Sequence, residues 1–222
     1  MPYWELGQSA MHVIVVGGHT RGIGKTSVMA GLIRNVKPPG LGGWTAVKVT
    51  QYGHGVCSHD GQACGCEPEE HPFALTEERD AAGRGDTSRF LAAGAHRALW
   101  LRVRQGQLAQ GIPVLRHALG GDEWVMIESN SILEFLAPDL YLMVVDAARR
   151  DFKESAQRFF HRADALVAIG VAAHESVWPN IRLTGASTKP VFHGDSFDYT
   201  SPELIEFVQR KLIAANPAPP LI

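Results

Sequence analysis

The residues with the clearest capacity for chemistry lie near the start of the chain, in the stretch VVGGHTRGIGKTSV at positions 15–28. Gly24, Lys25 and Thr26 match the end of the phosphate-loop pattern G-x-x-x-x-G-K-[ST]. In such a loop, consecutive backbone amides and the free N–H groups of a helix start form a concave anion site. The lysine reaches the terminal phosphate oxygens, and the threonine hydroxyl binds Mg²⁺. The stretch therefore predicts a site for a phosphate chain and its metal ion.

The glycine that opens this loop is displaced by one position. Counting back from Gly24 places His19 where the usual pattern has glycine, and Gly18 stands one residue earlier. Read from Gly18, the loop is complete but one residue longer than usual. The alternative is an ordinary turn with a chance Gly-Lys-Thr. A short apolar run precedes the turn and a helical pattern follows it, however, and this is the context that a phosphate loop requires.

Acidic residues at the ends of predicted strands are candidates for holding Mg²⁺ and orienting water. Glu128 ends the run EWVMIE, and Asp146 ends LYLMVVD. In open α/β sheets the ligand site lies outside the carboxyl ends of the strands. Asp86 begins a further predicted helix as its cap, and Arg89 on that helix is expected to pair with an acid or to contact an anion. The alternatives are a cap or salt bridge for Glu128 and a helix cap for Asp146.

The predicted site residues fall into three roles. The predicted catalytic residues are Lys25, Glu128 and Asp86. The predicted Mg²⁺ ligands are Thr26, Glu128 and Asp86. The residues predicted to contact the nucleotide are Gly18, Thr20, Gly22, Ile23, Gly24, Lys25, Thr26, Ser27 and Lys48.

A second candidate site lies in the sequence CSHDGQACGC. It contains Cys57, His59, Cys64 and Cys66, and two further histidines lie nearby. Thiolate and imidazole are the ligands of tetrahedral Zn²⁺ sites. The spacing is not that of a standard zinc finger, so a loop with free thiols or a reversible Cys64–Cys66 disulfide is the alternative. A bound metal would either stabilise the structure of this loop or be delivered to a client enzyme.

Short apolar runs alternate with helical patterns along the chain, which predicts an α/β fold with a mostly parallel sheet flanked by helices. Residues 50–84 show no clear period and are predicted as an inserted loop that carries the cysteines. Residues 107–119 are predicted as an interrupted helix because Gly111 and Pro113 lie inside it. The expected organisation is a single domain over residues 1–222 with an insertion at about 50–84.

Composition narrows the function classes. The net charge is -2, from 21 Lys and Arg against 23 Asp and Glu, so a nucleic-acid partner is not expected. No apolar run approaches the roughly 20 residues that a membrane-spanning helix needs. The first residues lack the basic and apolar regions of a signal peptide. We therefore expect a cytoplasmic protein without a membrane partner.

The longer loop resembles that of dethiobiotin synthetase and related P-loop enzymes, in which a glycine and a threonine precede Gly-Lys-Thr. The resemblance implies a P-loop NTPase, and an ATP-dependent ligase as one activity. In that activity Lys48 would help to bind a carboxylate or a carbamate phosphate intermediate. The residues that carry the resemblance are Gly18, Thr20, Gly24, Lys25 and Thr26.

A second resemblance spans roughly the first 130 residues and is to the molybdopterin-guanine dinucleotide biosynthesis adaptor (MobB) family. It implies a small homodimeric P-loop protein that binds guanine nucleotide, hydrolyses it weakly or not at all, and assists a client enzyme in molybdenum-cofactor nucleotide attachment. The sequence contains no Asn-Lys-x-Asp signature for guanine. The matching residues are Lys48, Thr50, His54, Asp86, Thr87, Arg89, Ala93, Gly94 and Ala95, with the loop and Glu128.

The sequence therefore predicts Mg²⁺-dependent binding of ATP or GTP with slow hydrolysis. The resemblance to the MobB family implies that this binding assists molybdenum-cofactor nucleotide attachment. Two alternatives stay open. One is an ATP-dependent ligase like dethiobiotin synthetase. The other is a metal-handling protein in which the nucleotide state moves the Cys/His insertion.

Overall fold

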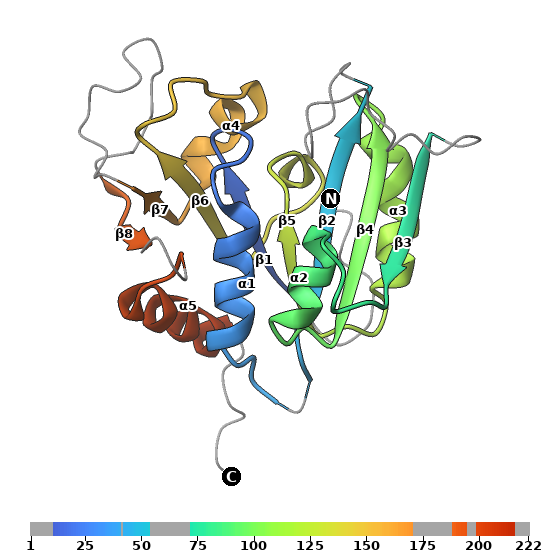
Figure 1. Ribbon diagram of the computed structural model, residues 1–222, viewed down its shortest axis with the longest axis horizontal. Helices are drawn as coiled ribbons and strands as arrows, with labels where there is room; N and C mark the ends of the chain where they lie inside the picture. Colours follow the sequence, from blue (N-terminus) through green and yellow to red (C-terminus); the bar gives the residue numbers. More distant parts are fainter. Residues whose placement is uncertain (1–10, 41, 54–71, 171–187, 195–198, 216–222) are drawn as a thin grey trace.

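A β-sheet runs through the centre of the molecule (Figure 1). The computed structural model describes residues 11–40, 42–53, 72–170, 188–194 and 199–215. In this part of the chain the strand order is β3-β4-β2-β5-β1-β6-β7-β8. Neighbouring strands are parallel except β3, which is antiparallel to β4. The strands are β1 His12–Gly18, β2 Thr45–Tyr52, β3 Phe73–Glu78, β4 Arg97–Arg104, β5 Trp124–Glu128, β6 Leu140–Asp146, β7 Ala165–Ile169 and β8 Val191–Gly194.

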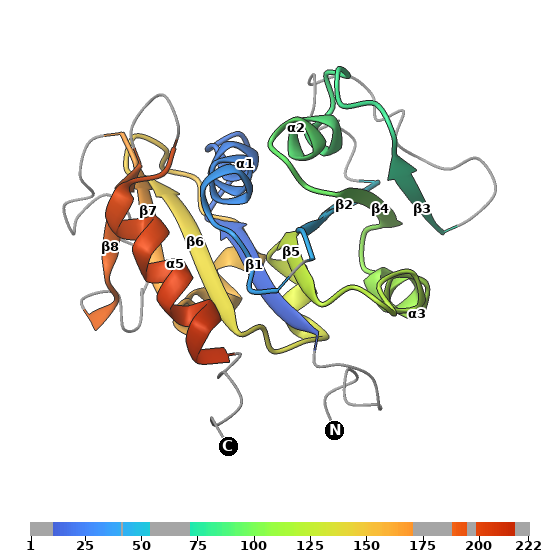
Figure 2. The ribbon, with the colours of Figure 1, turned by 90° about the horizontal axis from the view of Figure 1, so that it is seen from below.

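Helices cover both faces of this sheet (Figure 2). Helices α1, α2 and α5 pack on one face, and α3 and α4 pack on the other. The predicted α/β class with a mostly parallel sheet is thereby confirmed. None of the helices in the described ranges is long and apolar enough to cross a membrane. The helices are α1 Lys25–Asn35, α2 Asp86–Ala92, α3 Leu108–Ala118, α4 Glu154–Phe159 and α5 Pro202–Ala215, with short 3₁₀ helices η1 Ser131–Glu134 and η2 Phe160–Arg162.

The central strands are apolar along their whole length because both of their faces are covered. In β1, Ile14 and Val16 pack into the core beneath α1. Val13 and Val15 point to the opposite face and pack into the core that α3 and α4 close. Every residue of β1 is buried. This is why the segment appears in the sequence as one continuous apolar run without alternation.

The region predicted as an inserted loop contains regular structure in its described part. Strand β2 continues to Tyr52, and β3 forms an antiparallel edge strand against β4. The sequence of β3, FALTEE, has only half-buried and exposed side chains. Its apolar pattern is therefore too weak to indicate a strand, and pairing with β4 accounts for its conformation.

The predicted interruption of α3 is wrong. The helix continues through Gly111 and Pro113. Gly111 permits a close approach to β4, since a Cβ there would lie 3.1 Å from side-chain carbons of Leu101 and Val103. Leu115 is fully buried in the same interface. The packing of this face outweighs the backbone hydrogen bond that the proline cannot make.

The register of the parallel strands brings the predicted site residues to one edge of the sheet. Lys48 of β2 lies opposite Glu128 of β5, and Glu128 lies opposite Val16 of β1. On the other side, Gly18 of β1 lies opposite Val144 of β6. The loop after β1 therefore starts beside Glu128 and Lys48, at the carboxyl edge where open α/β sheets bind ligands.

Candidate functional site

The loop between β1 and α1 bends through two glycines in the left-handed region. Gly22 has φ 65° and Gly24 has φ 92°, values that residues with a Cβ avoid. Gly24 also lies against an aromatic ring, because a Cβ there would be 2.5 Å from Cε1 of Tyr199. The first turn of α1 carries no acidic side chain of its own. The free N–H groups at the start of the helix therefore favour an anion.

Asn130, which the sequence did not predict as a site residue, holds the start of the loop. Its Oδ1 accepts the N–H of Gly18 and its Nδ2 donates to the carbonyl of Gly18, both at 2.9 Å. A Cβ at Gly17 would lie 2.1 Å from Asn130 Oδ1. This contact explains the glycine at position 17, whereas a Cβ at Gly18 would lie 2.8 Å from side-chain carbons of Ile23 and Lys25. The signal in the sequence was the polar SNS that follows Glu128.

Lys25 begins α1 and folds its side chain back over the loop. Its Nζ donates to the carbonyl of Thr20 at 3.0 Å. Burial lowers the pKa of Lys25, and the carboxylate of Glu128 offsets part of that effect. In the described part of the chain, Lys25 forms no ion pair. Its ammonium group is therefore placed to meet an anion bound in the loop.

Lys48, Asp86 and Glu128 form a largely buried group that we call the acid–lysine cluster. The Nζ of Lys48 lies 3.1 Å from Glu128 Oε1 and is also ion-paired with Asp86. The hydroxyl of Thr26 donates to Glu128 Oε2 at 2.8 Å. Burial acts to lower the pKa of Lys48, but the two carboxylates raise it above its ordinary value. The predicted capping role of Asp86 is wrong, because the N-cap of α2 is Gly85 and Asp86 is the first residue inside the helix.

The acid–lysine cluster has the donors that Mg²⁺ prefers. Mg²⁺ takes oxygen ligands, typically one or two carboxylates together with phosphate oxygens. The hydroxyl of Thr26 and the carboxylates of Glu128 and Asp86 supply hard oxygens at the start of α1. Arg89 lies further out, 3.8 Å from Asp86, and donates to Ser27 Oγ at 2.8 Å. The residues present thus fit the predicted metal.

Three other predicted residues have structural partners. Thr20 donates its hydroxyl to the carboxylate of Asp151. Ile23 is buried in the core beneath the loop, so its backbone alone can face a ligand. Asp146 accepts the N–H of Ala148 at 2.9 Å. Its carboxylate therefore stabilises the turn after β6 and does not cap a helix.

His19, the extra residue of the loop, is fully buried and joins the loop to residues 149–153. Its Nε2–H donates to the carbonyl of Arg149 at 3.4 Å, and its ring centroid lies 5.2 Å from that of Phe152. Its carbonyl accepts the N–H of Lys153 at 2.8 Å. Burial lowers the pKa of His19, which keeps the imidazole neutral near neutral pH. The longer loop is therefore a loop that docks on the segment after β6.

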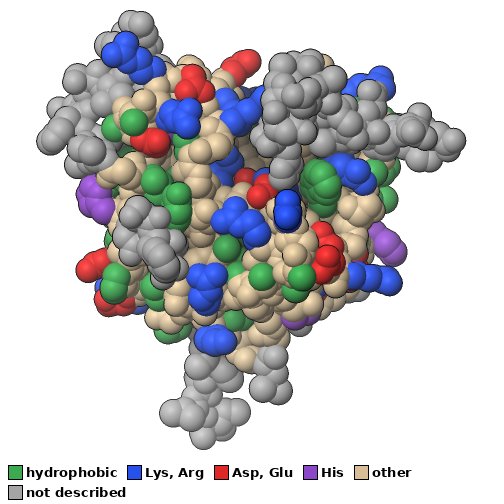
Figure 3. Space-filling model, in the orientation of Figure 1, with side chains coloured by type: hydrophobic (Ala, Val, Ile, Leu, Met, Phe, Trp, Pro, Cys, Tyr) green, Lys and Arg blue, Asp and Glu red, His purple; other side chains and the backbone are tan. Residues whose placement is uncertain are grey.

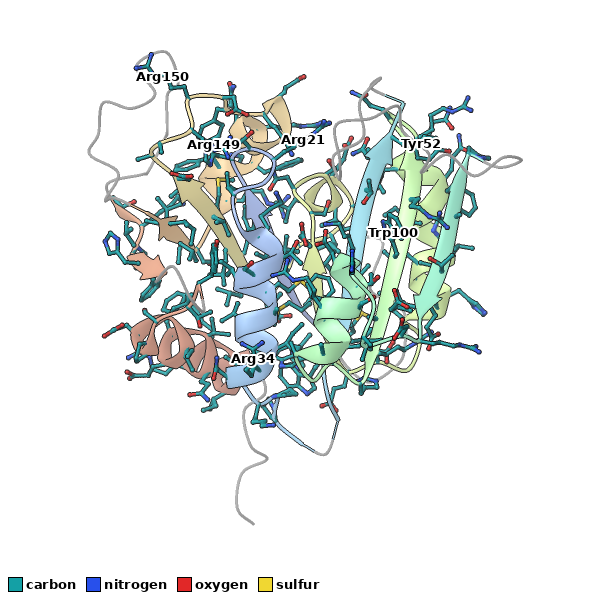
Figure 4. All side chains as sticks on the ribbon, viewed as in Figure 1. Arg21, Arg34, Tyr52, Trp100, Arg149 and Arg150 are labelled. Carbon is teal, nitrogen blue, oxygen red and sulfur yellow. The ribbon has the colours of Figure 1, made fainter. Side chains whose placement is uncertain are left out.

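The surface at this edge of the sheet carries both signs of charge. Figure 3 shows basic and acidic side chains gathered around a hollow in the upper centre of the face. Figure 4 shows Arg21 and Arg149 at the same upper end of the sheet, with Arg150 at the outer edge. Arg21 belongs to the loop, which therefore lies at this end of the sheet.

The predicted zinc ligands Cys57, His59, Cys64 and Cys66 lie outside the described residues, and the zinc site stays a prediction. Within the ranges that the structure describes, no group of three or more His, Cys, Asp or Glu side chains is placed to hold a metal ion. The predicted Mg²⁺ site has two carboxylates and a hydroxyl as its protein ligands.

The fold and the loop define the class of the chain. In this parallel α/β sheet, strand β1 leads through a glycine-rich loop into helix α1, which starts with Lys-Thr. This order of elements is the P-loop arrangement. No family model and no curated protein matches the sequence. The more specific resemblances to dethiobiotin synthetase and MobB therefore stay predictions.

Two solved structures share a limited likeness with the chain. One is HypB from Helicobacter pylori in complex with nickel, with TM-score 0.45 and 13% identity over 92% of this chain and 86% of that chain. The other is the "apo" form of LpxK from Aquifex aeolicus in complex with ATP, with TM-score 0.42 and 19% identity over 82% of this chain. The alignment covers 53% of the LpxK chain. At these TM-scores neither structure supports an inference about function.

Proposed function

We propose that the protein binds a nucleoside triphosphate, ATP or GTP, together with Mg²⁺ and hydrolyses it slowly. The observation that carries the proposal is the loop itself. Two glycines in the left-handed conformation turn the backbone so that the loop amides can face an anion. Lys25 lies over the loop and forms no ion pair in the described part of the chain. The hydroxyl of Thr26 meets the carboxylate of Glu128 at the same edge. An anion site beside an oxygen-rich cation site is the arrangement that a magnesium–triphosphate complex requires.

Each side chain has a definite part in this proposal. Lys25 and the loop amides stabilise charge on the β- and γ-phosphates. Thr26, Glu128 and Asp86 hold Mg²⁺, which neutralises phosphate charge when it is bound. Glu128 is engaged by both Thr26 and Lys48. A carboxylate so occupied is a poor base for water, which supports slow turnover.

The test is a calorimetric titration of the full chain with ATP and GTP, each with and without Mg²⁺. We expect Lys25→Ala to weaken binding about 10- to 100-fold, since a hydrogen bond to a charged group is lost. Lys37→Ala is the matched control, because Lys37 is exposed just beyond α1. Undiminished binding by Lys25→Ala would contradict the proposal, as would a failure of the unaltered protein to bind either nucleotide.

A second candidate function is ligation or phosphorylation of a small carboxylic acid. Residues of β2 and β4 beside the acid–lysine cluster support this candidate. The guanidinium of Arg102 lies 4.7 Å from the ring centroid of Trp100, whose Nε1 donates to Thr50 Oγ1 at 3.0 Å. The Nε of Arg102 is buried and has no hydrogen-bond partner in the described chain. A carboxylate acceptor would satisfy it. Turnover that rises only when a small carboxylic acid is added, and falls in Arg102→Met, would support this candidate over simple hydrolysis.

The link to molybdenum-cofactor nucleotide attachment is a further proposal that rests on sequence resemblance. Its motif residues Asp86, Thr87 and Arg89 lie on α2, and Thr87 donates to Glu78 Oε2 at 3.0 Å. The family resemblance also implies a homodimer and a client enzyme. Mass measurement in solution tests the dimer, and a monomer at all concentrations would argue against it.

The metal-handling alternative depends on residues outside the described chain. Metal analysis of the purified protein, repeated on Cys64→Ser with Cys66→Ser, tests it. Stoichiometric zinc that is lost in the double variant would support the alternative. Purified protein without transition metal would remove it.

A further inference from the structure

Lys153 lies at the phosphate loop although it is 128 residues from Lys25 in sequence (153 minus 25). Its N–H donates to the carbonyl of His19 at 2.8 Å, so its backbone is fixed on the loop itself. Its side chain is half-buried, and the positive charges of Lys25 and Arg21 act on its amine. We call Arg21, Lys25 and Lys153 the loop cations.

The loop cations have no carboxylate partners in the protein. Within the described residues none of the three forms an ion pair, and the hydrogen bond of Lys25 goes to a carbonyl. Glu128, whose charge acts on Lys25 and Lys153, is already bound by Thr26 and Lys48. Gathering like charges in a half-buried region is unfavourable. The arrangement therefore calls for an anion that the protein itself does not supply.

We propose that Lys153 is a second lysine for the bound triphosphate, held at the loop by residues 149–153; this inference rests on the proposed function. Lys25 approaches the phosphates from the start of α1, whereas Lys153 approaches from the segment after β6. Two contacts keep that segment in place, namely the hydroxyl of Thr20 on Asp151 and the ring of His19 against Phe152. The extra residue in the loop thus serves to bring in this lysine.

The electrostatics around Lys153 agree with this role. Burial, and then the charges of Lys25 and Arg21, lower the pKa of Lys153 to about 7, with Glu128 opposing the effect and Lys48 adding to it. Near pH 8 most of the amine is therefore neutral. A bound polyphosphate raises the pKa of an adjacent amine, so Lys153 takes up a proton as the anion binds. Binding must then weaken as the pH rises above 7, because a proton is consumed.

Calorimetry on the full chain tests the proposal, with ATP or GTP as the probe, whichever the unaltered protein binds more tightly. Titrations at about pH 8 in buffers of different ionisation enthalpy count the protons taken up. We expect Lys153→Met to bind about tenfold more weakly and to take up about one proton fewer. Lys153→Arg should keep its affinity without that proton uptake, because a guanidinium is always charged. Arg150→Met is the control, since Arg150 is an exposed cation of the same segment (Figure 4).

Each outcome decides the matter. Unchanged affinity and proton uptake in Lys153→Met would overturn the role of Lys153, while loss of binding in Lys25→Ala would leave the proposed function standing. Failure of the unaltered protein to bind any triphosphate would remove both. If Lys153→Met does not fold, Lys153→Arg decides alone: lost proton uptake with retained affinity supports the role, and unchanged proton uptake overturns it.

Discussion

The two sides of the phosphate loop carry opposite electrostatic arrangements. Towards β2 and β5, the acid–lysine cluster pairs its charges internally, with Lys48 between two carboxylates. Towards β6, the loop cations gather with no ion pair in the described chain. The paired side stabilises the fold without a ligand, whereas the unpaired side costs stability until an anion binds. Binding sites commonly trade stability for function in this way.

The largest expected effect comes from breaking the paired side with Lys48→Met. Removal of the ammonium leaves the carboxylates of Asp86 and Glu128 close together and largely buried. Loss of one partner from a buried ion pair costs about 3 kcal/mol or more, so we expect a drop of that size in the free energy of unfolding near pH 7, measured in urea. Mg²⁺ should restore more stability to the variant than to the unaltered protein, because it replaces the missing charge.

Two comparisons guard the interpretation of Lys48→Met. Lys37→Met removes an exposed lysine and should leave stability nearly unchanged. The loss in Lys48→Met should also shrink when Mg²⁺ is added, because the metal supplies positive charge between the two carboxylates. A loss that is the same with and without Mg²⁺ would show that packing, and not charge pairing, is what Lys48 contributes.

Glu128→Gln is expected to distinguish the contribution of Mg²⁺ to triphosphate binding from that of the loop. Glutamine keeps the shape of the side chain and can still accept the hydroxyl of Thr26, but it lacks the charge that Mg²⁺ needs. The gain in triphosphate affinity on adding Mg²⁺ should fall about tenfold, corresponding to about 1.5 kcal/mol, while affinity without Mg²⁺ is kept. Calorimetry with and without the metal measures both quantities.

The matched control for Glu128→Gln is Glu134→Gln. Glu134 lies in η1 and forms an exposed pair with Arg158 at 3.5 Å. It should leave the Mg²⁺ dependence unaltered, since exposed pairs contribute little. An undiminished effect of Mg²⁺ in Glu128→Gln would place the metal elsewhere and would undo the contrast between the two sides.

The unpaired charge of Lys153 should make the free energy of unfolding depend on pH. Lys153 has a pKa of about 7 in the folded protein and an ordinary value near 10.4 when unfolded. Between these values the unfolded chain binds more protons, so the free energy of unfolding rises with pH. We expect Lys153→Met to be more stable than the unaltered protein near pH 7, by about 1–2 kcal/mol after solvent screening. The difference should shrink towards pH 10.

Urea unfolding of the ligand-free protein across this pH range measures the effect. Arg150→Met should follow the unaltered protein at every pH, because Arg150 is exposed. Parallel curves for Lys153→Met and the unaltered protein would mean that Lys153 is not strained by its neighbours.

The loop motif and Glu128 could be predicted from the sequence, whereas two residues that contact the loop from far along the chain could not. Gly24, Lys25 and Thr26 form a local motif, and Glu128 ends an apolar strand, so position alone indicates their roles. Asn130 and Lys153 have no such local signal. Their contacts with the loop join residues more than 100 apart, as in the 112-residue separation of Gly18 and Asn130.

The elements follow the same rule. The central strand β1 was predicted because burial on both faces leaves a continuous apolar run. The edge strand β3 was missed because its side chains are half-buried or exposed and tertiary pairing forms it. Helix α4 begins only at Glu154, because the backbone N–H of Lys153 bonds to the carbonyl of His19 in the loop. Local pattern predicted structure where packing agreed with it, and failed where a distant contact prevailed.

The smallest expected effect tests how the unpaired side is held in place. Thr20→Val keeps the side-chain shape and the carbonyl that Lys25 uses, but it removes the hydrogen bond to Asp151. We expect a loss of about 0.5–1.5 kcal/mol in the free energy of unfolding at pH 7. That hydrogen bond is also the main cause that lowers the pKa of Asp151. The stability it provides is therefore present above the unfolded pKa of the carboxyl and is lost as the pH falls through the folded one.

A double-mutant cycle with Asp151→Asn isolates this contact from the general effect of each change. A coupling free energy of about 0.5 kcal/mol or more, which vanishes in acid, would show that Thr20 and Asp151 join the loop to residues 149–153. Zero coupling at pH 7 would mean that the ring of His19 and its carbonyl hold the segment without them. In that case Lys153 would keep its place at the loop in Thr20→Val, and triphosphate affinity would be unchanged. If the coupling is present, Thr20→Val should lower both the triphosphate affinity and the free energy of unfolding. The segment 149–153 would then hold Lys153 less firmly at the loop.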